Sequence, residues 1–392
     1  MSIEWNFSKR MAPISGSAIR ELLKLTAKPG MISFAGGNPG NFALPNEQIA
    51  EIAHDLLQSN GKQLLQYGPT EGYAPLKEAL ISYLRSEFGV TAESENILPV
   101  TGSTQAMDLL CKAYIDPGDT VLVENPTFLG NIQCMRILGA NIVPVSSDED
   151  GILPDALEDA MKHYHPKMLY TIPTFQNPTG ITMSLERRKE IAHLAAKYHV
   201  LVAEDDPYRS LRYRGTELPS IKSFDQDGWV MLLGSFSKVI SPGLRVGFMA
   251  GDAPMIRKCT ICKQSADVHT ATLNQAIVHA FLSKDLLRPH VKNICRTYAQ
   301  QMDAMLEKLQ AIELIRHFTH PEGGLFIFAS IDQGLDIQPY FKTAVERGVA
   351  FVPGEPFYPN GGHKNTFRLN FSNADIPTIQ RGMDILASCF KL

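Results

Sequence analysis

Long apolar runs are missing from this sequence of 392 residues. No window approaches the roughly 18 apolar residues that a membrane span needs, and the opening MSIEWNFSKRMAPISG lacks the apolar core of a signal peptide. A basic excess is missing too, because 37 basic and 41 acidic residues give a net charge of −4, without a basic stripe. We therefore expect a cytoplasmic protein that binds neither membranes nor nucleic acid.

Common metal and nucleotide motifs are also missing. The eleven histidines include no HExxH, and the sequence has neither a Walker A motif nor GxGxxG. The six cysteines are scattered, which fits a reducing compartment. Cys259 and Cys262 form a CxxC, but no second pair of ligands stands at the spacing that structural zinc needs. We predict no metal site.

The sequence does contain a regular alternation of strand and helix patterns. Apolar residues make up 44% and charged residues 20%, which is typical of globular proteins. Segments between several strands, such as Leu185–Tyr198, have the 3.6-residue apolar period of a helix. The pattern predicts an α/β fold with a large domain built on a mostly parallel seven-stranded sheet flanked by helices. The expected strands are Ile97–Val100, Thr120–Glu124, Asn141–Val145, Met168–Ile172, Val200–Glu204, Val230–Leu233 and Arg245–Ala250.

The two ends of the chain differ from this central part. The length exceeds what one hydrophobic core usually supports, so a second, smaller domain is expected. We predict that it is a compact α+β domain near the C-terminus. The segments that suggest it are a mainly helical stretch at Ala253–Leu309, strands at Leu325–Ser330, Ala350–Val352 and Thr366–Phe371, and a helix at Gln338–Arg347. Further helices are expected at Ser17–Leu25, Glu47–Leu57 and Tyr73–Leu84.

Polar residues follow several of the apolar strands, and the first of interest is Lys238. It lies in GSFSKVISPGLRVG (Gly234–Gly247), just beyond the strand at Val230–Leu233. In open α/β sheets, ligands bind at the carboxyl ends of the strands. Alone, Lys238 would be read as a solvated lysine, because lysines are mostly exposed. Together with the residues below, it suggests a lysine that forms a Schiff base with pyridoxal phosphate and then moves a proton at the substrate Cα.

Two segments could hold the phosphate of such a ligand. In TGSTQAMDLL a strand runs through Ser103 and Thr104 into a helix, whose N-terminus offers N–H groups to an anion. Serine and threonine also cap helices routinely. Arg245, with the hydroxyls of Ser235 and Ser237 nearby in sequence, could clamp the same phosphate.

Three further strand ends could hold an aromatic, cationic ring. Asp205 follows a buried strand and should seek a cation, such as a protonated pyridine nitrogen, although an N-cap role is the alternative. Asn177, in QNPTG, and Tyr208 could donate hydrogen bonds to the ring's phenolate oxygen, although most Asn-Pro turns are structural. Phe128 is either a core aromatic or a flat lid over the ring.

Two more features concern the substrate. Arg368, in TFRLNFS, alternates with apolar neighbours, so its guanidinium should point inward, to an α-carboxylate or an internal salt bridge. The loop AGGNPG contains Gly37, and glycine allows close backbone approach to a ligand. A plain surface loop is equally consistent with the residues.

Taken together, GSFSK with Arg245 following, NPTG, the DxxY of Asp205 and Tyr208, YGPTEG and FRLNFS resemble the fold-type I, class I/II aminotransferases. The motifs occur in family order over nearly the whole chain. The resemblance implies a pyridoxal 5'-phosphate enzyme and a homodimer with active sites at the subunit interface. It also implies an N-terminal arm (1–45) joining the small domain, a large cofactor domain (46–290) and a small domain (291–392).

The resemblance also implies roles for single residues. Lys238 matches the Schiff-base lysine, Arg368 the α-carboxylate clamp, and Tyr67 the tyrosine that reaches the neighbouring subunit's phosphate. Phe128 matches the ring-stacking position, where it lacks the hydroxyl that some members have. The opening SAIRELLKL…GMISFAGGNPGNFALP is most similar to the kynurenine/2-aminoadipate aminotransferase subgroup, in which the early arginine, here Arg20, lies near the substrate side chain.

The function expected from these features is a ping-pong exchange between an L-amino acid and a 2-oxo acid, with 2-oxoglutarate as the expected acceptor. Aminoadipate, aromatic or kynurenine, and branched or aliphatic donors all fit. One alternative is a lyase on the same fold, such as a carbon–sulfur β-lyase. A non-enzyme alternative is the sensor domain of a transcriptional regulator, although no helix-turn-helix precedes the first motif.

Overall fold

The structure is a computed structural model, and it describes residues 5–11, 14, 16 and 30–391. The helix expected at Ser17–Leu25, including Arg20, lies outside the described residues. In the described chain, helices and strands alternate over most of residues 97–205, two more strands follow up to residue 250, and helices then dominate up to residue 310. This order agrees with the alternation read from the sequence.

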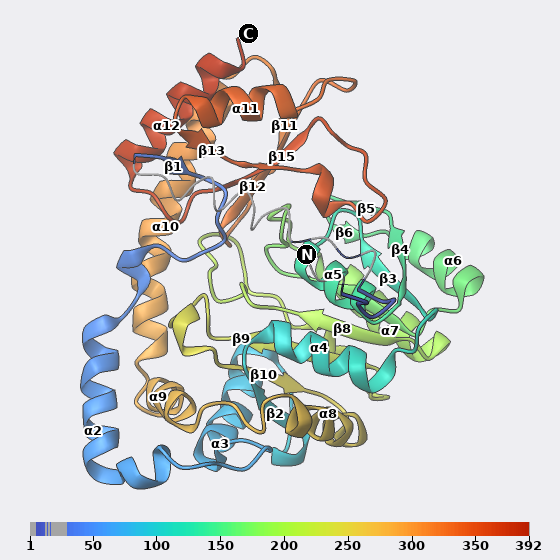
Figure 1. Ribbon diagram of the computed structural model, residues 1–392, viewed down its shortest axis with the longest axis vertical. Coiled ribbons are helices and arrows are strands. Elements are labelled where there is room, and N and C mark those ends of the chain that lie inside the picture. Colours follow the sequence, from blue (N-terminus) through green and yellow to red (C-terminus); the bar gives the residue numbers. More distant parts are fainter. Residues whose placement is uncertain (1–4, 12–13, 15, 17–29, 392) are drawn as a thin grey trace.

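A seven-stranded sheet forms the centre of the larger part of the molecule (Figure 1). Its strand order is β2-β10-β9-β8-β7-β3-β4, and all neighbours are parallel except β10, which is antiparallel to both β2 and β9. The prediction of a mostly parallel seven-stranded sheet is therefore confirmed, with strand ends shifted by no more than two residues. The strands are β2 (Ile97–Val100), β3 (Thr120–Glu124), β4 (Asn141–Val145), β7 (Met168–Thr171), β8 (Leu201–Asp205), β9 (Val230–Ser235) and β10 (Gly247–Ala250).

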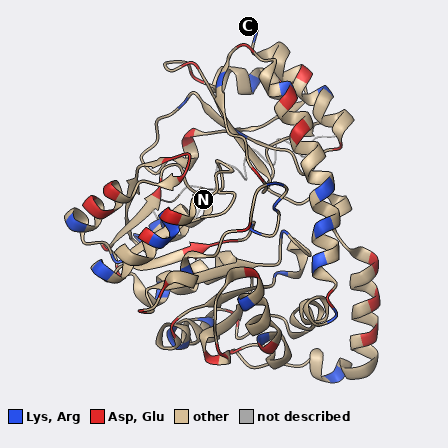
Figure 2. Ribbon diagram, turned by 180° about the vertical axis from the view of Figure 1, so that it is seen from behind, with Lys and Arg blue, Asp and Glu red and all other residues tan. Residues whose placement is uncertain are grey.

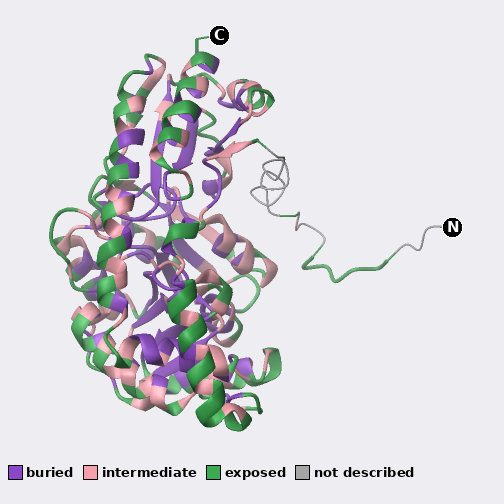
Figure 3. Cartoon of the chain, turned by 90° about the vertical axis from the view of Figure 1, so that its left-hand side faces the viewer, coloured by how far each residue is buried: buried purple, intermediate pink, exposed green. Residues whose placement is uncertain are grey.

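Both faces of this sheet are buried, which explains its nearly continuous apolar strands. Along β8, Leu201 and Ala203 enter the main core, whereas Val202 enters a second core. Figure 3 shows the buried residues running through the middle of the molecule, with exposed residues on the outer sides of the helices. Helices α6 and α7 supply the second core, and α3, α4, α8 and α9 pack against the first.

Among the helices of the larger part, the one predicted at Leu185–Tyr198 is confirmed to the residue, and the one predicted at Tyr73–Leu84 is one residue shorter at each end. The helix predicted at Glu47–Leu57 begins one residue earlier than expected and continues to Leu64. The helices of this part are α2 (Asn46–Leu64), α3 (Ala74–Tyr83), α4 (Ser103–Tyr114), α5 (Leu129–Ile137), α6 (Pro154–Tyr164), α7 (Leu185–Tyr198), α8 (Ala253–Ala266) and α9 (Thr272–Ser283). Cys259 and Cys262 both lie on α8, and no group of three or more His, Cys, Asp or Glu side chains among the described residues could hold a metal ion.

A smaller sheet and three helices form the other part of the molecule. The sheet has the order β11-β12-β15-β14, and the long helix α10 runs along one side from the larger part to this one (Figure 1). A two-residue strand near the N-terminus, β1, pairs in parallel with β13. These elements are β1 (Ile32–Ser33), α10 (Leu287–Gln310), β11 (Ile315–Phe318), β12 (Phe326–Ile331), α11 (Gln338–Glu346), β13 (Val349–Ala350), β14 (Val352–Pro353), β15 (Thr366–Asn370) and α12 (Ile376–Cys389).

The sequence missed several short elements. Strands β1 and β11 and the hairpin β5 (Ser147–Asp148) with β6 (Gly151–Ile152) gave no clear pattern, because they are short and, unlike the short strands of the large sheet, are not continuous apolar runs. The single strand expected at Ala350–Val352 is two strands, which Phe351 separates. One pairs with β1 and the other with β15, so tertiary pairing decides the division.

Charges are mixed over the surface. Figure 2 shows basic and acidic residues interspersed over both parts of the molecule. Among the described residues, no helix is long and apolar enough to cross a membrane.

Arg188 is a buried residue that joins several loops of the larger part by hydrogen bonds. It lies on α7 with none of its surface exposed. Its guanidinium donates to the carbonyls of Met183, Pro219 and Pro173, and to the hydroxyl of Thr174. It therefore fixes the loop that follows β7.

We predict that Arg188→Met lowers the free energy of unfolding by ~3 kcal/mol, because several buried acceptors lose their donor at once. Urea unfolding of the protein prepared without ligand measures this. Arg316→Met removes an arginine whose side chain is 59% exposed beside Asp332 and should leave stability almost unchanged. Equal, small effects of both substitutions would contradict the role assigned to Arg188.

Candidate active site

Lys238 lies three residues beyond β9, at the carboxyl edge of the large sheet. Its Nζ donates a hydrogen bond to the carbonyl of Gly37, at 2.9 Å. Burial, together with the positive charges of Arg245 and Arg368, lowers the pKa of Lys238 to about 8. The amine is therefore much easier to deprotonate than that of an ordinary lysine, which is what a nucleophile or a proton carrier requires.

Asp205 is the last residue of β8 and is only 4% exposed. Its Oδ2 accepts hydrogen bonds from the hydroxyl of Tyr170, at 3.0 Å, and the amide of Asn131, at 3.4 Å. Ser103 lies close enough to this carboxylate to oppose the rise in its pKa. Its Oδ1 is buried without a hydrogen-bond partner among the described residues. Desolvation raises the pKa of Asp205 to about 7, which marks a carboxylate in need of a cation.

Asn177, Tyr208 and Arg368 form a second buried group. The Asn177 amide nitrogen donates to the Tyr208 hydroxyl, at 3.5 Å, and its Oδ1 accepts from Nη1 of Arg368, at 2.7 Å. Arg368 lies on β15 of the smaller sheet and also donates to the carbonyl of Ala35, at 2.8 Å. These contacts join residues of the central strands to both ends of the chain.

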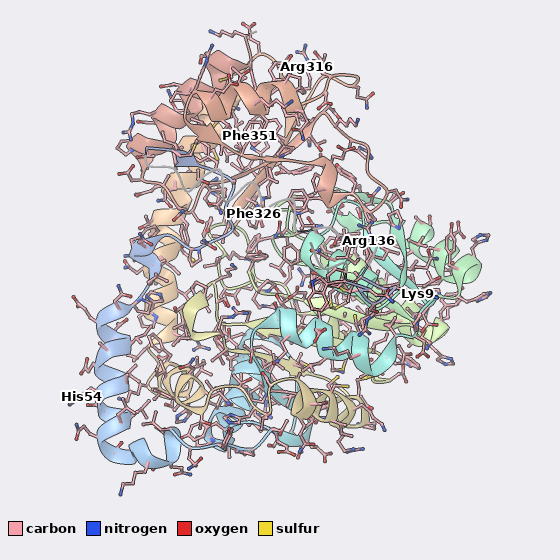
Figure 4. The ribbon with its side chains drawn as sticks, in the orientation of Figure 1. Lys9, His54, Arg136, Arg316, Phe326 and Phe351 are labelled. Carbon is pink, nitrogen blue, oxygen red and sulfur yellow. The ribbon has the colours of Figure 1, made fainter. Side chains whose placement is uncertain are left out.

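The Arg368 guanidinium faces no carboxylate within the part of the chain that the structure describes. It lies 4.2 Å from the ring centroid of Phe326, which Figure 4 shows at the junction of the two parts, and 5.0 Å from that of Phe357. Its Nε has no hydrogen-bond partner there, and burial lowers the pKa of Arg368 to about 10. The internal salt bridge, the other possibility open from the sequence, is not formed with any described residue. A buried guanidinium of this kind favours a small anion as its partner.

Arg245 lies close to the N-terminus of α4. Its Nη1 donates to the Ser237 hydroxyl, at 3.3 Å, and its Nη2 to the carbonyl of Thr101, at 3.0 Å. Gly102 takes the left-handed φ of +86°, and a Cβ there would lie 2.6 Å from Nη2 of Arg245. Only glycine lets the loop approach the guanidinium so closely.

Ser103 and Thr104 are the first two residues of α4, so their backbone N–H groups lack partners within the helix. The Ser235 hydroxyl accepts from the backbone N–H of Ser237, at 3.2 Å. The hydroxyls, the helix N-terminus and the Arg245 guanidinium all suit a phosphate group.

Phe128 is the N-cap residue of α5 and is half-buried. Its ring lies against Gly130, where an added Cβ would meet it at 2.7 Å. Asn131, in the first turn of the same helix, contacts Asp205. Phe128 therefore borders the site through α5.

Two expected residues do not join this group within the described chain. The side chain of Tyr67 is 82% exposed, and its nearest ring neighbour is His269, whose centroid is 6.0 Å away. Arg20 lies outside the described residues. Gly37, by contrast, contacts Lys238 directly through its carbonyl. Its lack of a side chain leaves room for the ring of Phe326, because a Cβ added at Gly37 would lie 3.3 Å from that ring.

The structure adds residues that the sequence did not indicate. Tyr170 and Asn131 reach Asp205 from β7 and α5. Buried Glu124 accepts from Thr171, from the backbone N–H of Ile172 and from Gln176, the residue before Asn177. The signal in the sequence was a polar residue inside an otherwise apolar strand, as at Tyr170, or at its end, as at Glu124, but such residues also occur in ordinary cores.

The group of residues suits a pyridine ring that carries a phosphate and an aldehyde. Oδ1 of Asp205 can accept from a protonated ring nitrogen, and the Asn177–Tyr208 pair can face an anionic ring oxygen. The α4 N-terminus with Arg245 suits the phosphate, and the Lys238 amine suits the aldehyde. The residues therefore fit pyridoxal 5'-phosphate.

Comparison with known proteins agrees. The family model described as "Aminotransferase class I and II" matches residues 30–386. The chain belongs to this family. This aminotransferase uses pyridoxal 5'-phosphate, and its fold is fold type I, as predicted.

Relatives of known name span the whole chain. It is 40% identical to the 2-aminoadipate transaminase of Thermus thermophilus, over 99% of this chain and 98% of that protein. It is 38% identical to aromatic-amino-acid aminotransferase 1 of Thermococcus litoralis, over 100% and 95%. The crystal structure of alpha-aminoadipate aminotransferase from Thermus thermophilus, complexed with N-(5'-phosphopyridoxyl)-L-leucine, superposes with a TM-score of 0.91, 39% identity and coverage of 98% and 97%. These matches support the aminotransferase interpretation over the lyase and sensor alternatives.

Asp205 should make the stability of the cofactor-free enzyme depend on pH. Because its pKa is about 7 in the folded state and lower in the unfolded state, its unfavourable contribution grows as pH rises towards 7. We predict that Asp205→Asn stabilises the enzyme by ~2–3 kcal/mol more at pH 8 than at pH 5. Urea unfolding at the two pH values measures this. The same difference from wild type at both values would show that Asp205 does not titrate in this range.

Proposed function

We propose that Lys238 holds the cofactor and moves the proton at the substrate Cα. When bound, pyridoxal 5'-phosphate supplies an aldehyde and an electron-withdrawing ring. Desolvation lowers the pKa of Lys238 to about 8, so its amine can both take up and return a proton near neutral pH. Asp205 keeps the ring nitrogen protonated, while Asn177 and Tyr208 hydrogen-bond the ring oxygen.

We further propose that Ser103, Thr104, Ser235, Ser237 and Arg245 bind the phosphate, and that Phe128 covers the ring. The support is their position around the α4 N-terminus and the α5 N-cap. Arg368 binds the substrate α-carboxylate, with Asn177 orienting its guanidinium. Gly37 and Arg20 complete the substrate side of the site in this proposal.

One observation carries the amino-acid assignment. The amine of Lys238 and the guanidinium of Arg368 donate to carbonyls of one short segment, at Gly37 and Ala35. Two residues of extended chain span about 7 Å at most. The group that handles an amine and the group that binds a carboxylate therefore both meet the same short segment of chain.

The substrates proposed are an L-amino acid and a 2-oxo acid, exchanged by a ping-pong mechanism with 2-oxoglutarate as the acceptor. The relatives are named for 2-aminoadipate and aromatic amino acids, and the similar crystal structure holds a leucine adduct. We therefore propose 2-aminoadipate, aromatic amino acids including kynurenine, and branched or aliphatic amino acids as donors.

We propose a cytoplasmic homodimer in which Tyr67 completes the partner's phosphate site. A large aromatic ring that is 82% exposed in the single chain is consistent with a subunit contact. The six free cysteines suit the cytoplasm. The domains proposed are an arm (1–45), a large domain (46–290) and a small domain (291–392), and the pairing of β1 with β13 supports assigning the arm to the small domain.

The donor class is tested with the purified enzyme and a panel of aminoadipate, kynurenine, phenylalanine, leucine and methionine. Each active donor alone should convert the bound cofactor to its amino form, seen by absorbance, and 2-oxoglutarate should then reverse the change. Steady-state rates with both substrates should give the parallel-line pattern of ping-pong kinetics. Release of ammonia and pyruvate without an acceptor would contradict the proposal.

The roles of Lys238 and Arg368 predict different kinetic losses. Lys238→Ala should lower kcat by ~10⁴-fold, because the proton carrier is gone. Arg368→Gln should raise KM for both substrates by ~100-fold, because the carboxylate loses a buried charged partner. Arg316→Gln, far out on the smaller sheet (Figure 4), is the control and should change neither value. A large kcat loss without a KM change in Arg368→Gln would contradict its role as a clamp.

A further inference from the structure

A second buried lysine lies close to Thr101 and Gly102, which precede α4, the helix whose N-terminus is proposed above to bind the phosphate. Lys263, on α8, has no exposed surface. Its Nζ donates to both carboxylate oxygens of Asp267, at 2.8 and 2.9 Å, and to Oε1 of Gln105, at 2.8 Å. All three ammonium protons thus have acceptors, and Lys263 itself is buried while 28% of the Asp267 side chain is exposed.

The acceptors of Lys263 are themselves tied to the strand end that precedes α4. Oδ2 of Asp267 accepts from the Thr101 hydroxyl, at 3.0 Å, and from Nε2 of Gln105, at 2.7 Å. Oε1 of Gln105 accepts from the backbone N–H of Thr101, at 2.8 Å. Thr101 is therefore held at its backbone N–H and at its hydroxyl, both by partners of Lys263.

The carbonyl of the same residue points to the other side of the loop. It accepts from Nη2 of Arg245, at 3.0 Å, and the next residue is Gly102, which contacts that guanidinium closely. A rotation of the Thr101 peptide would therefore move Arg245 and the start of α4 together. Lys263 itself makes none of its hydrogen bonds to the proposed cofactor-binding side chains.

We propose that Lys263 is a positioning residue for the cofactor phosphate: with Asp267 and Gln105 it fixes the Thr101 peptide, which in turn aims Arg245 and the α4 N-terminus. The proposal rests on the phosphate-binding role proposed above for Arg245. It concerns only the phosphate end of the cofactor, because the network does not touch Asp205, Asn177 or Lys238 among the described contacts.

Stability alone gives little reason for this arrangement. A buried ion pair gains little over well-packed apolar side chains, because desolvation offsets its attraction. The pair of Lys263 and Asp267 does hold a fixed geometry, because every N–H of the ammonium has an acceptor at hydrogen-bond distance. Lys222 and Asp225 offer a matched comparison, with Nζ and Oδ2 2.7 Å apart and exposed fractions of 14% and 2%. This second pair lies at the opposite edge of the sheet, where Asp225 accepts from the first backbone N–H of β9.

The test compares the binding of pyridoxal 5'-phosphate and of pyridoxal, which lacks the phosphate, to the cofactor-free enzyme. In Lys263→Met we expect the Kd for pyridoxal 5'-phosphate to rise ~10–100-fold, the range seen when residues that orient ligand-binding groups are removed. The Kd for pyridoxal should stay unchanged. Inorganic phosphate should raise the Tm of the cofactor-free wild type, and Lys263→Met should lose this rise.

Thr101→Val is a milder second variant, since it keeps the carbonyl and the volume but loses the hydroxyl bond to Asp267. It should show a smaller loss in the same direction, and it keeps the test valid if Lys263→Met does not fold. Lys222→Met is the matched control and should bind both ligands as the wild type does. The proposal would be overturned if Lys263→Met and Thr101→Val weakened the binding of pyridoxal 5'-phosphate and of pyridoxal equally, or left the binding of both unchanged.

A separate variant keeps the two proposals distinguishable. Arg245→Gln should weaken pyridoxal 5'-phosphate binding selectively if Arg245 binds the phosphate. If Arg245→Gln has no selective effect, the role of Arg245 in the proposed function is wrong. If it has that effect while the Lys263 and Thr101 variants do not, only the positioning role of Lys263 is wrong.

Discussion

A carboxylate buried at the end of a parallel strand is the constraint on which the site depends. Asp205 closes β8 in an environment that raises its pKa to about 7, and one of its oxygens has no partner among the described residues. Tyr170 and Asn131 hydrogen-bond the other oxygen but bring no positive charge. The remaining oxygen is directed to a cation that the described chain does not supply, and a protonated pyridine ring provides one.

The topology of the sheet explains why distant residues meet at this carboxylate. Strands β3, β7, β8 and β9 are parallel neighbours, so the segments that follow them all emerge at one edge. Strand β10 runs antiparallel and therefore begins at that edge, which places Arg245 beside the segment that follows β2. Arg368 arrives from the smaller sheet and meets the same edge through Asn177.

The sequence predicted the large sheet because its strands are short apolar runs bounded by polar residues. Lys238, Asp205 and Asn177 were predicted for the same reason, since each follows such a run. Tyr170 was not, because its hydroxyl meets the site only once Asp205 of the next strand lies beside it. Lys263 looks like any lysine in an amphipathic helix, and its burial depends on Gln105, 158 residues earlier in the chain.

The smaller elements show the same limit. A two-residue strand such as β1 has no periodicity of its own and exists because β13, more than 300 residues later, pairs with it. Tyr67 was predicted from family resemblance, and its exposed ring has no described partner in the site of its own chain. Contacts of long sequence separation, or between chains, leave no local pattern to read.

The pairing of β1 with β13 and the continuous helix α10 have a consequence for how such a protein can evolve. The smaller part draws on both ends of the chain, and α10 belongs to both parts at once. No single cut in the gene therefore yields a fragment that encodes one part without breaking the other. To move the smaller part alone, recombination would have to transfer both ends of the chain, whereas the whole unit can be fused to another protein in one step.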